Sequence, residues 1–299
     1  MNRKINPKIS ALLVIFAGVL WGVTSIFVKG LDGFGLNSME IGVLRTGICT
    51  ALLFFIILIY KPSLFRIKLR DIWMFIGTGL FSLVFFSICY FKTIVDAGPS
   101  IAVSLLYTSP VWVMLFSAVL FEERLTAQKI VAIPIAVLGC ALTTGIIGTG
   151  ASLTPQIIIT GLLSGIGYAL YSVFGRYATE KYNSLTITFY TFLFAFIGFL
   201  CFTKPGEIVQ KCTADSKAIL LAVLIAIVSS LLPYIFYTIG LNNMEASVAA
   251  VLVAVEPLVG CVIGITVFHD GASPSKIIGI ARILGSIDFL IIRRKIIAY

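Results

Sequence analysis

Long apolar runs alternate with short polar segments along the whole chain. Most of them contain about the 20 residues that an α-helix needs to cross a bilayer. Ten runs can be distinguished, at residues 9–28, 41–60, 72–94, 100–120, 130–147, 157–174, 185–202, 219–239, 247–268 and 277–292. Because most connections between them are short, successive helices should be antiparallel neighbours. The pattern therefore predicts an all-α membrane protein with ten transmembrane helices.

The same pattern occurs twice, at an offset of 147 residues. Pro110 lies inside the fourth run, and Pro257 lies at the equivalent position of the ninth. Other equivalent pairs are Gly18 with Gly165, Ser82 with Ser229, Tyr90 with Tyr237 and Phe121 with Phe268. Ordered agreement of glycines, prolines and aromatic residues at one offset indicates an internal repeat. We expect two five-helix domains, at residues 9–147 and 155–292, joined by a linker at residues 148–155.

An odd number of helices in each copy determines how the copies face. After five crossings the second copy enters the membrane from the opposite side, so the two repeats should be inverted. Inverted repeats recur in secondary transporters, where the binding site lies between the copies near the bilayer midplane. The repeat and its odd helix count are the strongest indication of function in the sequence.

Composition agrees with a membrane location. Of the 299 residues, 59% are hydrophobic and only 12% are charged, whereas about a quarter of residues are charged in soluble domains. The net charge of +9 does not indicate a nucleic-acid partner, because the basic residues lie between apolar runs and form no basic and aromatic surface. The six cysteines include no CxxC pair, so neither a metal site nor a cofactor is expected.

The distribution of lysine and arginine predicts the orientation. If the N-terminus is cytoplasmic, the segments inside carry fourteen of these residues and those outside carry six. Cytoplasmic loops are enriched in lysine and arginine. We therefore expect a multi-pass protein of the plasma membrane with both termini in the cytoplasm.

Glu256 is the sharpest candidate for chemistry. It precedes Pro257 in the middle of the ninth run, where a carboxylate costs several kcal/mol and usually serves a function. One interpretation is that Glu256 binds a proton or a substrate amine. The other is a structural carboxylate tied to nearby hydroxyls or to Arg45. Arg45 would either bind a substrate carboxylate through its planar guanidinium or lie near the outer interface with a structural role.

Further candidates share a position well inside the runs. Polar side chains in hydrocarbon need partners, so they should face the interior of the bundle. They are Trp21, Thr24, Ser25, Tyr90, Tyr107, Tyr168, Tyr171 and Tyr237. As a group they would line a cavity for an amphipathic solute, or they would link helices by hydrogen bonds. The expected partners are a small-molecule substrate and the lipid bilayer, and the sequence leaves monomer and homodimer open.

Several motifs together resemble a known family. They are the segment from Ala17 to Gly22, Arg45 early in the second run, Phe121 to Thr126 after Pro110, and the Glu256-Pro257 pair. This ordered set resembles the drug/metabolite transporter superfamily, specifically proteins with two EamA-type domains. The resemblance implies a ten-helix carrier with a central cavity and both termini inside. Relatives of this kind export amino acids or other small metabolites.

Together these features predict a secondary transporter rather than an enzyme. We expect export of amino acids or related compounds by alternating access, with Pro110 and Pro257 marking paired weak points. The alternative is an uptake carrier, or a drug or nucleobase-type permease of the same superfamily. A membrane-embedded enzyme is disfavoured because the chain contains no HExxH and no GxSxG motif. A channel would be expected to repeat a filter loop, and no such loop repeats.

Overall fold

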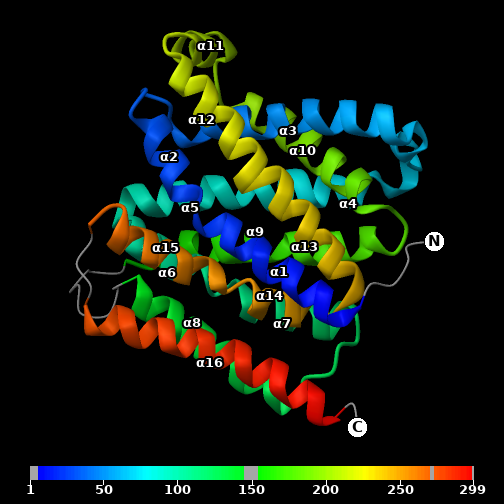
Figure 1. The fold of residues 1–299 in the computed structure, drawn as a ribbon, viewed down its shortest axis with the longest axis vertical. Coiled ribbons are helices and arrows are strands. Elements are labelled where there is room, and N and C mark those ends of the chain that lie inside the picture. Colours follow the sequence, from blue (N-terminus) through cyan, green and yellow to red (C-terminus); the bar gives the residue numbers. More distant parts are fainter. Residues whose placement is uncertain (1–5, 145–153, 270–272, 298–299) are drawn as a thin grey trace.

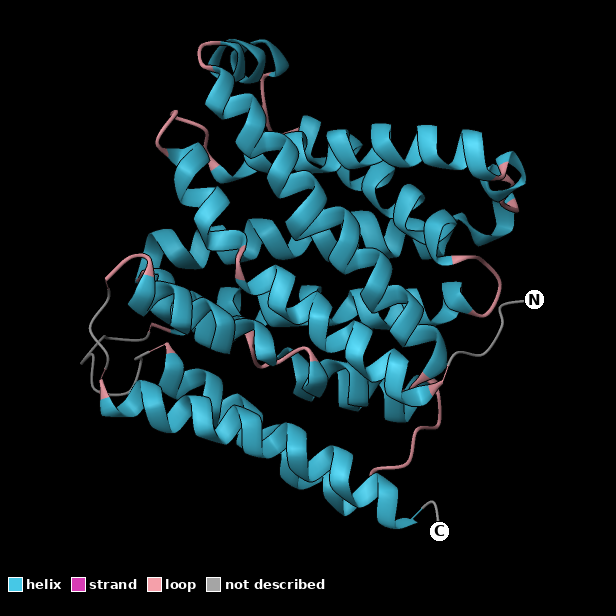
Figure 2. Cartoon of the chain, viewed as in Figure 1, coloured by secondary structure: helices cyan, strands magenta, loops and turns pink. Residues whose placement is uncertain are grey.

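The computed structural model describes residues 6–144, 154–269 and 273–297, and within them it contains helices and loops but no strand (Figures 1 and 2). The first half contains α1 (Pro7–Gly22), α2 (Thr24–Asp32), α3 (Ser38–Tyr60), η1 (Pro62–Phe65), η2 (Leu69–Asp71), α4 (Ile72–Ile76), the π-helical segment η3 (Gly77–Val84), α5 (Phe85–Ala97), α6 (Pro99–Leu106), α7 (Ser109–Leu120) and α8 (Ala127–Thr143). The second half contains α9 (Pro155–Thr179), α10 (Ser184–Leu200), α11 (Pro205–Thr213), α12 (Ser216–Ala226), the π-helical segment η4 (Ile227–Leu231), α13 (Leu232–Asn243), α14 (Ala246–Leu252), α15 (Val255–Thr266) and α16 (Pro274–Ile297). Most of the expected linker at residues 148–155 lies outside the described residues.

The helices confirm an all-α membrane protein. Each of the ten apolar runs overlaps one helix or two or three consecutive helical segments. Within the described residues, seven helical rods are long and apolar enough to cross a membrane, and α10 with α11, bent by 103°, would make an eighth. Large apolar side chains such as Ile59 and Val95, each 84% exposed, suit a surface that faces lipid. The number of ten transmembrane helices stays a prediction.

Local signals explain where several helices begin. The side chain of Asn37 accepts hydrogen bonds from the backbone of Met39 and Glu40, and the Glu40 carboxylate accepts one from the Asn37 backbone N–H, 2.8 Å away. This reciprocal capping box starts α3. Glu40 is also paired with Lys211 of α11, at 2.7 Å between Nζ and Oε1. Helix α11 was not predicted from the sequence, and this ion pair ties it to the start of α3.

Three of the predicted membrane helices are interrupted. Val23 separates α1 from α2, residues 107–108 separate α6 from α7, and residues 253–254 separate α14 from α15. The last two breaks lie at almost equivalent places of the two halves. Pro110 and Pro257 lie in the first turn of the segment that follows each break. Backbone N–H groups in a first turn have no acceptor within the helix, so the N–H that proline lacks costs no helical hydrogen bond there. The prolines therefore mark the start of a new segment, and the chain bends just before them.

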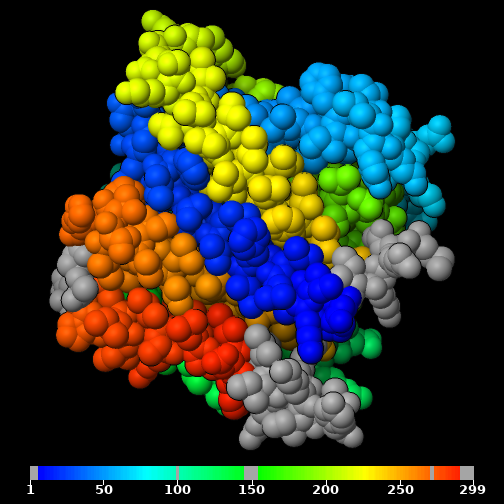
Figure 3. All heavy atoms as spheres, in the orientation of Figure 1, coloured from blue at the N-terminus to red at the C-terminus, as the bar shows by residue number. Residues whose placement is uncertain are grey.

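The first helix of each half packs closely on the broken helix of the other half. A Cβ atom at Gly18 of α1 would lie 2.5 Å from Val255 Cγ1 and 3.0 Å from the Val253 carbonyl oxygen. At the equivalent Gly165 of α9, a Cβ atom would lie 2.7 Å from Thr108 Oγ1 and 3.1 Å from the carbonyl oxygen of Leu105. Figure 3 shows the face on which α1 lies between the α12–α13 rod and α15. Small residues at such positions let helix backbones approach in a membrane.

The Gly165 contact can be tested by adding one methyl group. We predict that Gly165→Ala destabilises the protein by about 1–3 kcal/mol, the usual cost of overpacking a filled site. The measurement is the thermal unfolding midpoint of the purified protein in detergent, which should fall by several degrees.

Gly285→Ala is the matched control, because a Cβ atom at Gly285 of α16 meets nothing within 4 Å. Alanine is favoured over glycine in an open helical position by about 1 kcal/mol, so this variant should unfold at the same temperature or higher. Equal shifts in both variants would show that the close approach at Gly165 is not required.

Candidate functional site

A cavity of about 620 Å³ lies between the broken helices. Small-molecule sites usually have about 300–1,000 Å³, so the volume suits a metabolite. Both halves line the cavity, with residues from α1, α2, α3, α5, α6 and α8 on one side and from α9, α10, α12, α13, α15 and α16 on the other. It reaches one end of the bundle at Lys29, Phe268 and Lys276, which we call the cavity mouth.

Eight of the ten residues proposed from the sequence line this cavity. They are Trp21, Thr24, Ser25, Arg45, Tyr90, Tyr107, Tyr168 and Glu256. The other two, Tyr171 and Tyr237, are buried beside it. The Tyr171 hydroxyl lies 2.7 Å from Thr238 Oγ1, and the Tyr237 hydroxyl lies 2.7 Å from Ser172 Oγ. These two tyrosines link α9 to α13, while substrate binding by the other eight stays a prediction.

Glu256 lies in the first turn of α15, directly after the break. The Tyr168 hydroxyl donates a hydrogen bond to its Oε2 atom at 2.8 Å, and Tyr107 from the other half lies close to the same carboxylate. The free N–H groups at a helix N-terminus also favour a negative charge. Among the described residues Glu256 forms no ion pair with Arg45. The carboxylate is therefore held by tyrosines and remains accessible from the cavity.

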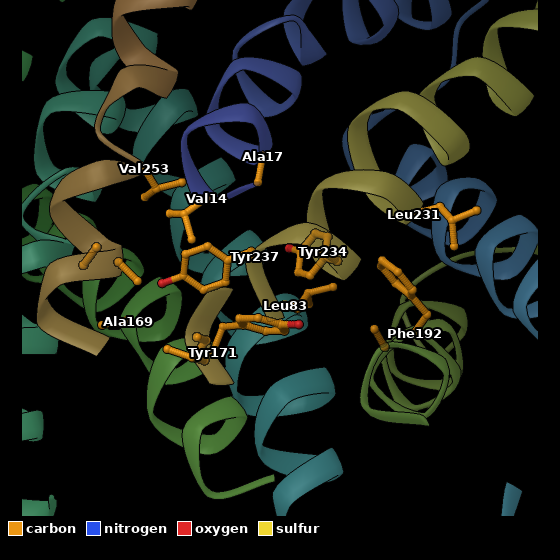
Figure 4. Packing of buried hydrophobic residues seen from close by; sticks show 14 of the residues in the cluster. Val14, Ala17, Leu83, Ala169, Tyr171, Phe192, Leu231, Tyr234, Tyr237 and Val253 are labelled. Carbon is orange, nitrogen blue, oxygen red and sulfur yellow. The ribbon is translucent and has the colours of Figure 1, made fainter. Parts of the chain in front are cut away.

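An aromatic cluster contributes to the lining of the cavity. The ring of Trp21 lies 5.0 Å from that of Tyr234 and 5.5 Å from that of Tyr237, and the rings of Tyr171 and Tyr234 are 5.0 Å apart, measured between centroids. Figure 4 shows these three tyrosines packed among apolar residues that include Val14 and Val253. Trp21 and Tyr234 face the cavity. Tyr171 and Tyr237 are buried and do not line the cavity.

A polar cluster joins the two halves at that opposite end. Lys129 Nζ lies 3.3 Å from Glu123 Oε2 and 3.3 Å from Glu245 Oε2, and the Ala246 backbone N–H donates to Glu123 Oε1 at 2.8 Å. The Ser247 hydroxyl donates to Glu123 as well. The side chains of Lys129 and Glu123 are only 4% and 8% exposed. We call these residues the Glu123 cluster; it connects the turn between α7 and α8 to the turn between α13 and α14.

Sequence reasoning missed several residues that line the cavity. Lys29, Lys276, Phe86 and Tyr234 were not proposed as site residues, although all four line the cavity. Lys29 Nζ lies 3.4 Å from the ring centroid of Phe268, a cation–π contact. Helical spacing contained a signal for Tyr234, because it lies three residues before Tyr237 and therefore beside it on α13.

Comparison with known proteins places this architecture in a family. The sequence model of the EamA-like transporter family matches residues 8–145 and 155–292. A protein of Archaeoglobus fulgidus named as an uncharacterized transporter is 27% identical over 92% of this chain and 93% of its own length. The uncharacterized transporter YxxF of Bacillus subtilis is 26% identical over 97% of this chain and 94% of its own length.

Two further similarities extend the comparison. The pseudopaline exporter CntI of Pseudomonas aeruginosa is 25% identical over 82% of each chain. A solved crystal structure superposes with a TM-score of 0.80 over 97% of this chain and 99% of its own, at 18% identity, which shows a shared fold. Because the family match covers both halves and nearly the whole length, the chain belongs to the EamA-like transporter family.

Proposed function

We propose that this protein exports amino acids or related small organic metabolites across the plasma membrane by alternating access. The observation that carries the proposal is the asymmetry of the cavity. Its lining includes the exposed Lys29 at the cavity mouth, whereas the Glu123 cluster, which joins the two halves at the other end, has its ion pair of Lys129 and Glu123 almost fully buried. A relative named as an exporter supports the direction of transport.

The proposal includes ten membrane crossings in two inverted five-helix repeats. The support is that the close packing of α1 on the α14–α15 break has its counterpart in the packing of α9 on the α6–α7 break. Helices α8, α10 and α16 would supply the remaining crossings. Figure 1 shows that α1 begins and α16 ends toward the same side of the bundle, as an even number of crossings requires. This side, which also holds the Glu123 cluster, would be cytoplasmic.

The breaks give this mechanism a physical basis. Helices α14 and α15 run from the Glu123 cluster to the cavity mouth, with Glu256 beside the break between them. In secondary transporters, interrupted helices at the midplane hold the substrate while the two sides open in turn. Opening of the cytoplasmic side would separate Glu123 from Ser247 and from the Ala246 backbone. Glu256 would bind the solute or a proton in both states.

We predict that Glu123→Gln shifts the protein toward the state that is open to the cytoplasm. The substitution keeps the shape of the side chain but removes its charge–charge attraction to Lys129. Cys261 lines the cavity and can report access from the mouth, in a background in which the exposed Cys201 is replaced by serine. A membrane-impermeant maleimide added outside should label Cys261 several-fold more slowly in Glu123→Gln.

Glu122→Gln provides the control, since Glu122 is the preceding residue of the same turn and is exposed. It should leave the labelling rate unchanged. Labelling of Glu123→Gln at the wild-type rate would mean that the Glu123 cluster does not hold the cytoplasmic end closed.

We predict that Glu256→Gln folds normally but transports weakly or without pH dependence. Glutamine can still accept the Tyr168 hydrogen bond, so only the ionisable charge is lost. Counterflow in proteoliposomes measures this, with a solute that protects the wild-type protein against thermal unfolding, across about pH 5 to 8. Glu180→Gln removes an exposed carboxylate and should behave as wild type. Wild-type transport by Glu256→Gln at every pH would assign Glu256 a structural role.

A further inference from the structure

The described lining of the cavity contains more cationic residues than acidic ones. Lys29, Arg45 and Lys276 are its cationic lining residues, and Glu256 is the one carboxylate among the described lining residues. Lys29 is exposed, and Arg45 and Lys276 are half-buried, so water screens their charges only in part on the cavity side. The cavity therefore attracts anionic groups, with a single deep position for a cationic group or a hydrogen-bond donor.

Arg45 is the central cation of this set. It lies two turns inside α3 and forms no ion pair with any described residue. The acidic residue nearest to it on the same helix, Glu40, is already bound to Lys211 and to the Asn37 backbone. Arg45 is half-buried, and a partly desolvated guanidinium without a carboxylate partner favours an anion beside it. Its planar fork matches a carboxylate in a bidentate geometry.

The cavity mouth contributes two lysines to the lining. Lys29 Nζ lies over the Phe268 ring, 3.4 Å from its centroid, so an aromatic face positions its ammonium group. Lys276 from α16 lines the same mouth. Cations at the entrance of a cleft raise the local concentration of anionic solutes.

We infer that the solute is an amino dicarboxylate, a compound with two carboxylates and one amino group. This rests on the proposed transport function and names the substrate class for the same cavity. The amino group would lie at Glu256, between Tyr107 and Tyr168. One carboxylate would pair with Arg45, and the second would face the mouth at Lys29. Trp21 and Phe86 line the cavity and would contact the carbon chain between them.

The test compares acids with their own amides. Purified protein is heated with L-aspartate or L-glutamate, in parallel with their amides L-asparagine and L-glutamine, and with L-lysine as a cationic comparison. Each amide has nearly the shape of its acid but lacks one negative charge. At least one acid should protect the protein at a concentration about ten-fold lower than its amide, which corresponds to one charge-assisted pair. Lysine should protect least.

Variants connect that preference to particular side chains. Arg45→Gln should abolish the preference for acid over amide, and Lys29→Gln, at the surface end of the cavity, should reduce it several-fold. Lys204→Gln is the control, because Lys204 is exposed and paired with Glu207 at 3.1 Å, away from the cavity. If Arg45→Gln fails to fold, Lys29→Gln still decides the question.

Two results would overturn the inference. One is equal or better protection by the amides or by lysine, and the other is no protection by any of the acids. Transport of a neutral or cationic solute by the wild-type protein, with the Glu123→Gln labelling effect intact, would reject the substrate class and leave the transporter in place. If the wild-type protein transported no solute and Glu123→Gln had no effect on labelling, the transport function would be rejected as well.

Discussion

The structure depends on covering interrupted backbone inside a membrane. A helix break leaves peptide groups without their helical partners, and lipid offers no hydrogen bonds in their place. Such breaks are stable only where protein surrounds them or a cavity lies beside them. Here Gly18 lies against the Val253 carbonyl, and Gly165 lies against the Leu105 carbonyl. Glycine at these two positions lets one helix cover the broken backbone of another, and this close packing fixes how the two halves meet.

From that packing the cavity follows. Where α14 ends and α15 begins, the chain exposes the N-terminus of α15 to the interior, and Glu256 stands in its first turn. Tyr107 lies in the equivalent break of the first half, so both breaks contribute to the surroundings of one carboxylate. The same helices extend away from the cavity to the Glu123 cluster. A movement at the breaks would therefore change the carboxylate site and the closed end together.

Much of this arrangement could be predicted from the sequence, because it is local or periodic. Apolar runs show the helices, and an acid beside a proline inside a run shows where the cavity lies. The exact break could not be read, because residues 107–108 and 253–254 precede the prolines that draw attention. Tyr171 and Tyr237 could not be told from cavity residues, since one turn of helix decides which side they face. Glu123 and Glu245 are far apart in the chain and meet only through the packing of the halves.

Alternating access can be tested most directly by measuring distances at both ends of the molecule, in the wild-type protein and in Glu123→Gln. Spin labels at positions 124 and 242 would report the distance across the Glu123 cluster, and labels at positions 32 and 277 the distance across the cavity mouth. Pulsed electron resonance in lipid nanodiscs gives both distributions. Alternating access predicts that Glu123→Gln lengthens the first distance and shortens the second. A simultaneous lengthening of both, or a change in only the first, would contradict it.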